Sequence, residues 1–499
     1  MATGFWGEDL VCRRVRQMAR QGAIGVEELI RRKVCSLRQW KMTRFGNQQA
    51  NGRRFEFTLM TYNILSQTAI ENHRYLYRKC DSRFLDEDYR ISQILPEILN
   101  SQSDVICLQE VEERLFEEKI RGKFHSNGFE GLFKKRTCKD DGCAILWRTQ
   151  KFSLIDHENV EFAKKDHEIL NRDNIGLIAV LKPKHPDTTR IKLHVATTHL
   201  LFNPRRGDIK LSQLRLLLAQ LEKMALKKVG SDGQRTYHPV ILCGDFNIAP
   251  HSPLYEFIDT GRLDVHNRMS GDLSGQSEGK NKGRRVTTWQ LSLKSVGIDD
   301  AGRLESVNES SDSLSASKKL CTSNKQNISS KPSPSSPCSS EVTDGAQSGN
   351  NSNCVNLDPN WLASVKNPAW IAAFQSLNGV QAAKDSESVD FVSPSPCFYH
   401  DFHFVPAYKY HTDKEELPVT CMTGRDVNNV DHIFYNVTEK FSPRAYKEGR
   451  LKLLGVYSLM HEKDLLDIGG LPNASLGSDH IFLMAKFAIS GYYQSEKTH

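Results

Sequence analysis

Carboxylate, amide and imidazole side chains recur along this chain beside short apolar segments of the kind that form buried strands. One such residue alone is most simply a helix cap or a turn at a strand end, because Asp and Asn favour both positions. Repetition at six places along one chain is harder to explain by caps. The residues are Asn63, Glu110, His199, Asp245 with Asn247, Asp431, and Asp479 with His480.

These residue types suit the hydrolysis of a phosphate ester. The reaction benefits from a hard cation such as Mg²⁺, which binds carboxylate oxygens and offsets negative charge on the phosphoryl group. Glu110 is the best single candidate for a metal ligand. Asp245 and Asn247 stand two residues apart at a strand end, so both side chains can point to one side. His480 can transfer a proton near neutral pH, and Asp431 can hold its imidazole in one tautomer.

Strands and helices must bring these distant residues together. The apolar runs do not alternate with helices in regular βα units, so we expect an α+β fold of two packed sheets with helices outside. Two further ordered segments follow at 431–435 and 478–483, in which apolar residues come after the polar ones. Strands are predicted at 57–65, 104–110, 143–148, 174–181, 191–199 and 240–243, and helices at 88–100 and at 211–229, where Gly230 ends the pattern.

Composition divides the chain into segments. Residues 1–54 are basic and helix-prone, and we expect a solvated helical arm. From Arg303 to Ser352, 16 of 50 residues are Ser and none is aromatic, so this segment cannot offset its ordering entropy. We predict that 270–355 is mostly disordered, with a short strand near 286–291. Order is expected to return by Trp361. Because similar polar residues lie on both sides, the insertion interrupts one catalytic domain, 55–488, which a tail at 489–499 follows.

Bulk properties constrain function weakly. The net charge of +7 fits a polyanionic partner, but many enzymes without one share it. The twelve cysteines are scattered and form no C-x-x-C pair, which favours reduced thiols in an intracellular protein over disulfides or zinc. No apolar run approaches the roughly 18 residues of a membrane helix, and the start lacks a secretory signal, so we expect no membrane contact and a location in the cytoplasm, the nucleus or both.

Five short blocks together resemble the endonuclease–exonuclease–phosphatase superfamily. The resemblance covers about 55–270 and 355–488 and implies a four-layer αββα sandwich of two packed mixed β-sheets, with the active site at one end. It also implies that Glu110 binds Mg²⁺ with support from Asn63, that Asp479 lies beside the metal, and that His199 contacts the phosphate. The blocks are Thr61-Tyr62-Asn63, Leu108-Gln109-Glu110-Val111, Thr198-His199-Leu200, Gly244-Asp245-Phe246-Asn247 and Ser478-Asp479-His480.

Within the superfamily, residues 171–176 and 203–211 resemble the deadenylase and nocturnin branch, and the whole chain is similar to its Angel family. The resemblance makes Asn174, Pro204 and Asn247 candidate substrate contacts. Deadenylases of this branch stack an adenine between a proline, matched by Pro204, and a phenylalanine whose position is Asp426 here. Losing that ring removes about 1–3 kcal/mol of stacking, which counts against adenine-specific trimming.

The resemblance therefore implies an Mg²⁺-dependent phosphoesterase that hydrolyses and removes 2′,3′-cyclic phosphates from RNA 3′ ends. One or two metal ions fit, and Mn²⁺ can substitute. Two alternatives stay open: a 3′–5′ poly(A) exoribonuclease, and a non-catalytic relative that binds RNA or a translation factor. The retained residues Glu110, Asp245, Asn247 and His480 favour an enzyme.

Overall fold

The computed structural model describes residues 25–47, 54–304, 397–409, 418–424, 426–442 and 445–491. Contacts divide the chain into one compact unit of Met1–Val307 with Pro394–His499 and another of Asn308–Ser393, and the described residues belong to the first. The part of the predicted disordered insertion after Leu304 and the expected return of order at Trp361 lie outside the described residues.

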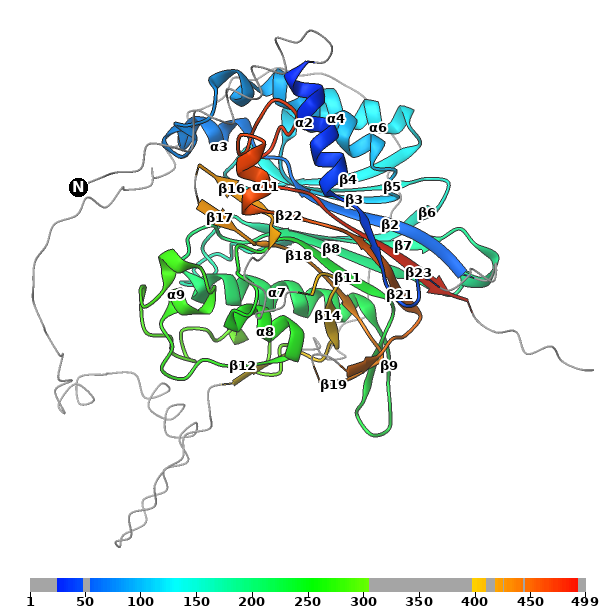
Figure 1. Ribbon diagram of the computed structural model, residues 1–499. Coiled ribbons are helices and arrows are strands. Elements are labelled where there is room, and N and C mark those ends of the chain that lie inside the picture. The colour runs from blue at the N-terminus through cyan, green and yellow to red at the C-terminus, as the bar shows by residue number, and fades with distance from the viewer. Residues whose placement is uncertain are drawn as a thin grey trace, which may run out of the picture. The chain divides into compact units, whose positions relative to one another are not determined.

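Two large sheets form the body of the molecule (Figure 1). The first has seven strands and is mixed, because β2 and β3 run parallel while its other neighbouring strands pair antiparallel. Its order is β1 (Trp40–Met42), β21 (Leu451–Tyr457), β23 (Leu483–Ser490), β2 (Arg54–Asn63), β3 (Val105–Glu112), β5 (Asp141–Arg148) and β4 (Phe129–Lys135).

The second sheet has six strands and is also mixed, with β11 and β8 parallel and the other pairs antiparallel. Its order is β14 (Phe404–Pro406), β18 (Asp431–Asn436), β11 (Val240–Asp245), β8 (Leu193–His199), β7 (Ile175–Pro183) and β6 (Phe152–Glu161). Short two-stranded pairs join β9 (Leu226–Val229) with β10 (Arg235–Tyr237), β12 (Arg262–Asp264) with β13 (Cys397–Tyr399), β15 (Pro418–Val419) with β22 (Met460–His461), β16 (Cys421–Thr423) with β17 (Asp426–Asn428), and β19 (Glu439–Ser442) with β20 (Ala445–Lys447).

Side chains on the central strands are apolar on both faces, and alternation along a strand sends them to two different cores. On β2, Phe57 and Leu59 join the large core that includes residues of both sheets. Met60 and Tyr62, on the opposite face, join a second cluster with Ile94 of a covering helix. Layers therefore form on both sides of this sheet, which fixes the orientation of the strand that ends at the predicted site.

Helices cover the outer faces of the sheets (Figure 1), with α2, α4 and α6 outside the first sheet and α7 and α8 outside the second. This arrangement confirms the predicted αββα sandwich. No described helix is both long and apolar enough to cross a membrane. The helices are α2 (Val26–Leu37), α3 (Gln67–Asn72), α4 (Glu87–Asn100), α5 (Glu113–Leu115), α6 (Gly122–Ser126), α7 (Gly207–Ala225), α8 (Pro253–Thr260), α9 (Ser270–Leu273) and α11 (Glu462–Asp467).

The expectation of a solvated arm over 1–54 is wrong for its described part. α2 is present, but β1 extends the seven-stranded sheet by pairing with β21. Between them Arg38 is buried, and its guanidinium donates to the carbonyl oxygens of Ser458 at 2.9 Å and Phe482 at 2.7 Å. Hydrogen bonds from a buried arginine tie this segment to the domain, because breaking them would leave a buried charge without these acceptors.

The expectation of disorder is also wrong for 270–304, which is folded. Leu273, Leu291 and Ile298 are fully buried there. Polar side chains of this stretch form hydrogen bonds to the backbone. For example, Ser274 Oγ donates to the Pro204 carbonyl at 2.8 Å. Sequence composition does not reveal that this segment folds. Hydroxyl groups that hydrogen-bond to the backbone of a neighbouring loop lower the free-energy cost of ordering a polar segment. The short strand expected at 286–291 is absent from these described residues.

Two element boundaries differ from expectation. The helix predicted at 211–229 spans Gly207–Ala225, because 226–229 instead pairs with β10. Asp479 and His480 precede β23 in a loop, where His480 makes an isolated bridge with Cys421. β23 itself continues to Ser490, so the first residues of the predicted tail belong to the domain.

Candidate active site

Three of the predicted residues are neighbours across the second sheet. Asp245 ends β11 and stands in register with His199 on β8 and with Asp431 on β18. Because β11 and β8 are parallel, their carboxyl ends meet at one edge, and β18 begins at that edge because it runs the other way. Pairing of strands far apart in sequence thus places two carboxylates and an imidazole side by side.

The first sheet contributes Asn63 and Glu110. Asn63 ends β2 and pairs in register with Gln109, the residue before Glu110. Glu110 lies at an irregularity in the β3–β5 pairing and has a φ of +56°. A non-glycine residue in this left-handed region costs roughly 1–2 kcal/mol, so the surrounding structure must hold it there. The bulge turns the carboxylate of Glu110 toward Asn63.

The side chain of Asn63 joins the two sheets. Its Nδ2 donates to Glu110 Oε1 at 3.0 Å and to Asp245 Oδ2 at 3.1 Å, while its Oδ1 accepts from the Leu65 amide at 3.0 Å. Ser66 N donates to Glu110 Oε2 at 2.9 Å. Asn63 therefore holds two carboxylates through its amide nitrogen, and its further role as a metal ligand stays a prediction.

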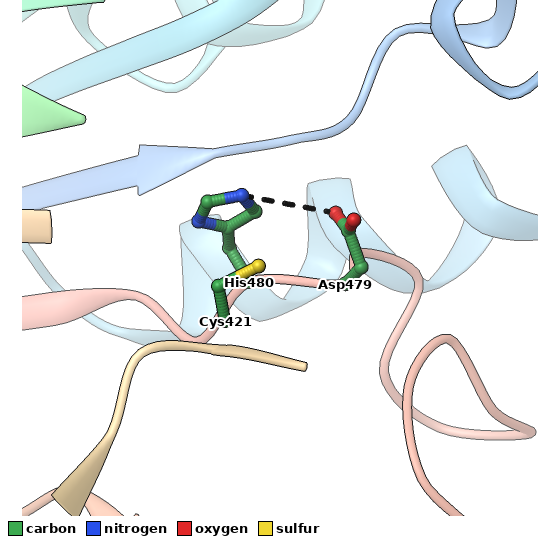
Figure 2. Close-up of side chains that lie close together, drawn as sticks. All are labelled: Cys421, Asp479 and His480. Atoms are coloured by element: carbon green, nitrogen blue, oxygen red, sulfur yellow. Dashed lines mark ion pairs between the residues drawn. The ribbon is translucent and has the colours of Figure 1, made fainter. Parts of the chain in front are cut away.

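The closing pair lies against the same edge. His480 Nδ1 contacts Asp431 Oδ2 at 2.8 Å, so the predicted pairing of these two side chains is present. Figure 2 shows Cys421, Asp479 and His480 close together, with the dashed ion pair joining His480 Nε2 and Asp479 Oδ1 at 3.9 Å. Nε2 also lies 3.9 Å from Asp245 Oδ2. One imidazole thus spans three carboxylates.

Burial and neighbouring charge set the protonation of the cluster. Burial opposes the charge on Glu110, but His199 and the Asn63 amide outweigh it and hold the Glu110 pKa below its usual value. Burial raises the pKa of Asp245 and that of Asp479. Burial alone would lower the pKa of His480, yet the facing Asp431 carboxylate raises it well above the ordinary value. The facing carboxylate therefore favours the charged imidazole.

Asn247 is held from three sides. It has a φ of +51°, its amide N–H donates to Asp245 Oδ1 at 2.9 Å, and its Nδ2 donates to the Leu200 carbonyl at 3.1 Å. Its own carbonyl accepts a 2.7 Å bond from Lys210 Nζ. Lys210 is fully buried in α7, and burial lowers its pKa to about 7. This lysine fixes the loop that carries Asn247.

The donor set fits a divalent cation. Four carboxylates converge with two imidazoles in a buried site, which leaves an excess of negative charge. Among the described residues, Asp431 Oδ1, Asp479 Oδ1 and His199 Nδ1 are buried without a hydrogen-bond partner, a costly state that a cation relieves. Ligand atoms of Asp245, Asp431 and His480 lie within 4.8 Å of one another, as do those of Cys421, Asp479 and His480.

The predicted substrate contacts lie around this cluster. Asn174 Nδ2 donates to the His199 carbonyl at 3.1 Å, and its Oδ1 accepts from Gln213, so its contact in the structure is to the backbone behind His199. Pro204 is half-exposed on the loop that follows His199. Asp426 is exposed on β17. Contact of Asn174, Pro204 or Asn247 with substrate stays a prediction.

Sequence reasoning missed several residues of the site. Tyr77 is buried and donates to Asp479 Oδ2 at 2.8 Å, and Thr423 Oγ1 lies 3.4 Å from the same oxygen. Cys421, which the sequence predicts only as one of twelve reduced thiols, lies beside Asp479 and His480. Nothing local marks these three, since their roles depend on distant strands. Lys210 carried a weak signal, because a lysine amid leucines of a buried helix requires a specific partner.

The chain is similar to known proteins in sequence and in structure. The model of the Endonuclease/Exonuclease/phosphatase family matches residues 60–480. Protein angel homolog 2 of Bos taurus is 34% identical over 443 residues, covering 87% of this chain and 70% of that protein. Protein angel homolog 1 of Homo sapiens is 32% identical over 465 residues, covering 89% and 64%.

A solved structure is similar throughout. It is the crystal structure of ANGEL2, a 2′,3′-cyclic phosphatase, in complex with adenosine-2′,3′-vanadate. Its identity to this chain is 32% and its TM-score 0.65, and the match covers 91% of this chain and 99% of that one. The fold, the buried constellation and these relatives agree, and the chain belongs to the Endonuclease/Exonuclease/phosphatase family, among the Angel homologues.

Proposed function

We propose that this chain is an Mg²⁺-dependent phosphoesterase that hydrolyses and removes 2′,3′-cyclic phosphates at RNA 3′ ends. The observation that carries the proposal is the similarity of nearly the whole domain to a 2′,3′-cyclic phosphatase bound to adenosine-2′,3′-vanadate. The buried constellation supports it, since Glu110, Asp245, Asn247, Asp431 and His480 are all retained in mutual contact or close by.

His480 is the proton donor in this proposal. Asp431 holds Nδ1, so Nε2 faces the other carboxylates, and the raised pKa keeps a proton on the ring at neutral pH. A charged Nε2–H can donate to a phosphoryl oxygen and then protonate the departing ribose oxygen. Asp431 acts through the ring by fixing its tautomer and is a positioning residue.

Asp245 is the proposed proton acceptor. Burial raises its pKa, which makes its carboxylate a stronger base than an exposed one. In the first hydrolysis, the oxygen of water bonds to phosphorus, one phosphorus–ribose oxygen bond breaks, Asp245 takes the water proton, and His480 supplies a proton to the freed hydroxyl. A second hydrolysis of the resulting monoester releases inorganic phosphate. His199, whose Nε2 lies 3.6 Å from Asp245 Oδ2, and the Asn247 side chain are the proposed contacts to the phosphate.

The metal requirement rests on the carboxylates. Glu110 and Asp479 are the proposed Mg²⁺ ligands, and metal titration tests whether one or two ions bind and whether Mn²⁺ substitutes. When bound, the cation offsets charge on the phosphoryl oxygens and lowers the pKa of a bound water. Asn63 donates one amide hydrogen to Glu110 and one to Asp245 and so holds both carboxylates in place.

Two 5′-labelled RNAs test the proposal, one ending in a 2′,3′-cyclic phosphate and one in oligo(A) with a free 3′ hydroxyl. Loss of phosphate from the first without shortening is the expected result, and EDTA should abolish it. Glu110→Ala should lower kcat at least 1,000-fold, whereas Glu130→Ala, an exposed carboxylate on β4, should not change it. Shortening of the second RNA would instead identify a 3′ exoribonuclease, and inertness toward both would favour a non-catalytic role.

A further inference from the structure

An open pocket lies beside the catalytic cluster. It has a volume of about 250 Å³. One wall comes from the chain after α3, where Tyr75, Arg78 and Lys79 line it, and the other from the β16–β17 hairpin, where Thr423 and Asp426 line it. Figure 1 shows α3 and this hairpin at the same end of the two sheets.

The pocket shares a wall with the catalytic cluster. Tyr77 lies between two of the lining residues, and it is buried with its hydroxyl on Asp479 at 2.8 Å. Across the pocket, Thr423 Oγ1 lies 3.4 Å from the same carboxylate. The segment therefore turns one side chain into the cluster and its neighbours outward. A molecule that extends from the reacting phosphate past Asp479 meets this pocket next.

The charges on this segment lack partners in the structure. Arg74, Arg78 and Lys79 are exposed, and none forms an ion pair or side-chain hydrogen bond with a residue that the structure describes. Tyr75, beside them, is 58% exposed. Unpaired cations favour phosphate, and an accessible aromatic ring favours a stacked base. Asp426 adds an acceptor suited to a ribose hydroxyl or an exocyclic amine.

We propose that this pocket, with Tyr75, Arg78 and Lys79 as its contacts, binds the RNA nucleotide that precedes the reacting 3′ end. The inference rests on the proposed function and deepens it, since it makes the enzyme selective for oligonucleotides over mononucleotides. Arg78 and Lys79 bind the phosphates that lead into the site, and Tyr75 stacks on a base. The reaction itself does not involve them.

The test compares two substrates that differ only in having a preceding nucleotide: adenosine 2′,3′-cyclic monophosphate, and a ten-nucleotide RNA that ends in the same group. Arg78→Ala with Lys79→Ala should raise KM for the RNA about tenfold with kcat unchanged, and leave kcat/KM for the mononucleotide within twofold. The matched control replaces Lys227 and Lys228, two exposed lysines of β9, by Ala. That variant should behave as wild type toward both.

Salt dependence and stacking give further readouts. A single-stranded contact contributes roughly 0.7 to the slope of log affinity against log salt, so losing two cations should reduce that slope by about 1.4. Tyr75→Ala should weaken RNA binding several-fold, and Tyr75→Phe should restore it. Equal loss with both substrates, or an unchanged slope, would overturn the proposal.

A binding measurement tests the pocket independently of the proposed function. Fluorescence anisotropy of a labelled RNA with a 3′ hydroxyl needs no turnover. If wild type binds this RNA and the double variant binds it tenfold less tightly, the pocket stands even when neither substrate is hydrolysed, and only the proposed function fails. If all variants bind this RNA with the same affinity while the cyclic phosphate is hydrolysed, the proposed role of the pocket is refuted and the proposed function is supported. Thermal melting of each variant confirms that it is folded.

Discussion

Replacing Asn63 by Asp probes the carboxylate cluster most directly. The change keeps the size of a fully buried side chain and replaces an N–H donor by a third carboxylate about where Glu110 and Asp245 are now held at 3.0 and 3.1 Å. At an effective dielectric constant of about 20, each such pair repels by about 5 kcal/mol if both members are ionised. Keeping the new carboxyl protonated therefore costs less free energy than ionising it beside the other two carboxylates.

The cost of that proton sets the magnitude. A carboxyl with an ordinary pKa near 3.9 needs about 5 kcal/mol to stay protonated at pH 7.5 and about 1.5 kcal/mol at pH 5. The folded protein then binds a proton that the unfolded chain releases, so the variant loses stability as pH rises above about 4. One carboxylate also loses its donor, which adds roughly 1.5–3 kcal/mol at either pH.

Urea unfolding in EDTA at pH 5 and pH 7.5 measures the effect. Asn63→Ala is the matched control, because it removes the same donors without adding an acid. The difference between the two variants should widen by about 3 kcal/mol from pH 5 to pH 7.5. Adding Mg²⁺ should reduce this difference in stability between the two variants, since a cation compensates the added negative charge. Equal stability of Asn63→Asp and Asn63→Ala at both pH values would show that the new carboxyl does not face two ionised carboxylates.

Four other changes have outcomes that can be measured directly. Asp431→Asn should lower kcat about 100-fold or more with the melting temperature little changed, in steady-state assays of the cyclic phosphate. Burial raises the pKa of Glu97 to about 7, so the free energy of unfolding of the wild type falls as pH rises from 4.5 toward 7. Glu97→Gln cannot ionise, so its free energy of unfolding should exceed that of the wild type by about 1–3 kcal/mol at pH 8 but not at pH 4.5, as measured by unfolding curves. Lys210→Met should lower kcat at least tenfold by releasing the Asn247 carbonyl, and a normal rate would remove Lys210 from the site. Replacing 308–393 with a short Gly–Ser linker should leave kcat/KM within twofold.

Local pattern was enough to predict the strands that carry the site. The runs before Asn63, Glu110 and Asp245 are strongly apolar, and each folds as a buried strand within a few residues of its expected bounds. The contact between Asp431 and His480 was also predictable, because an imidazole that moves protons needs an acidic partner. These features depend on residue type and order alone.

Features that depend on distant pairing were not predictable. The helix expected to reach 229 stops at Ala225 because 226–229 pairs with β10, and a tertiary contact of that kind overrides helical spacing. Tyr77 reaches Asp479 from an irregular segment with no periodicity to read. The polar stretch 270–304 is folded because its hydroxyls bond the loop after His199 and its few leucines are buried, and overall composition does not reveal such contacts.

The backbone at Glu110 opposes the residue type that the site requires. A glutamate with a φ of +56° adopts a conformation that glycine and, less strongly, asparagine prefer. The Asn63 and Ser66 donors to its carboxylate offset that preference. Replacing the glutamate by glycine would relax the backbone by roughly 1 kcal/mol and remove the carboxylate with it. A variant can therefore lose the metal ligand at this bulge and still fold as well as the wild type.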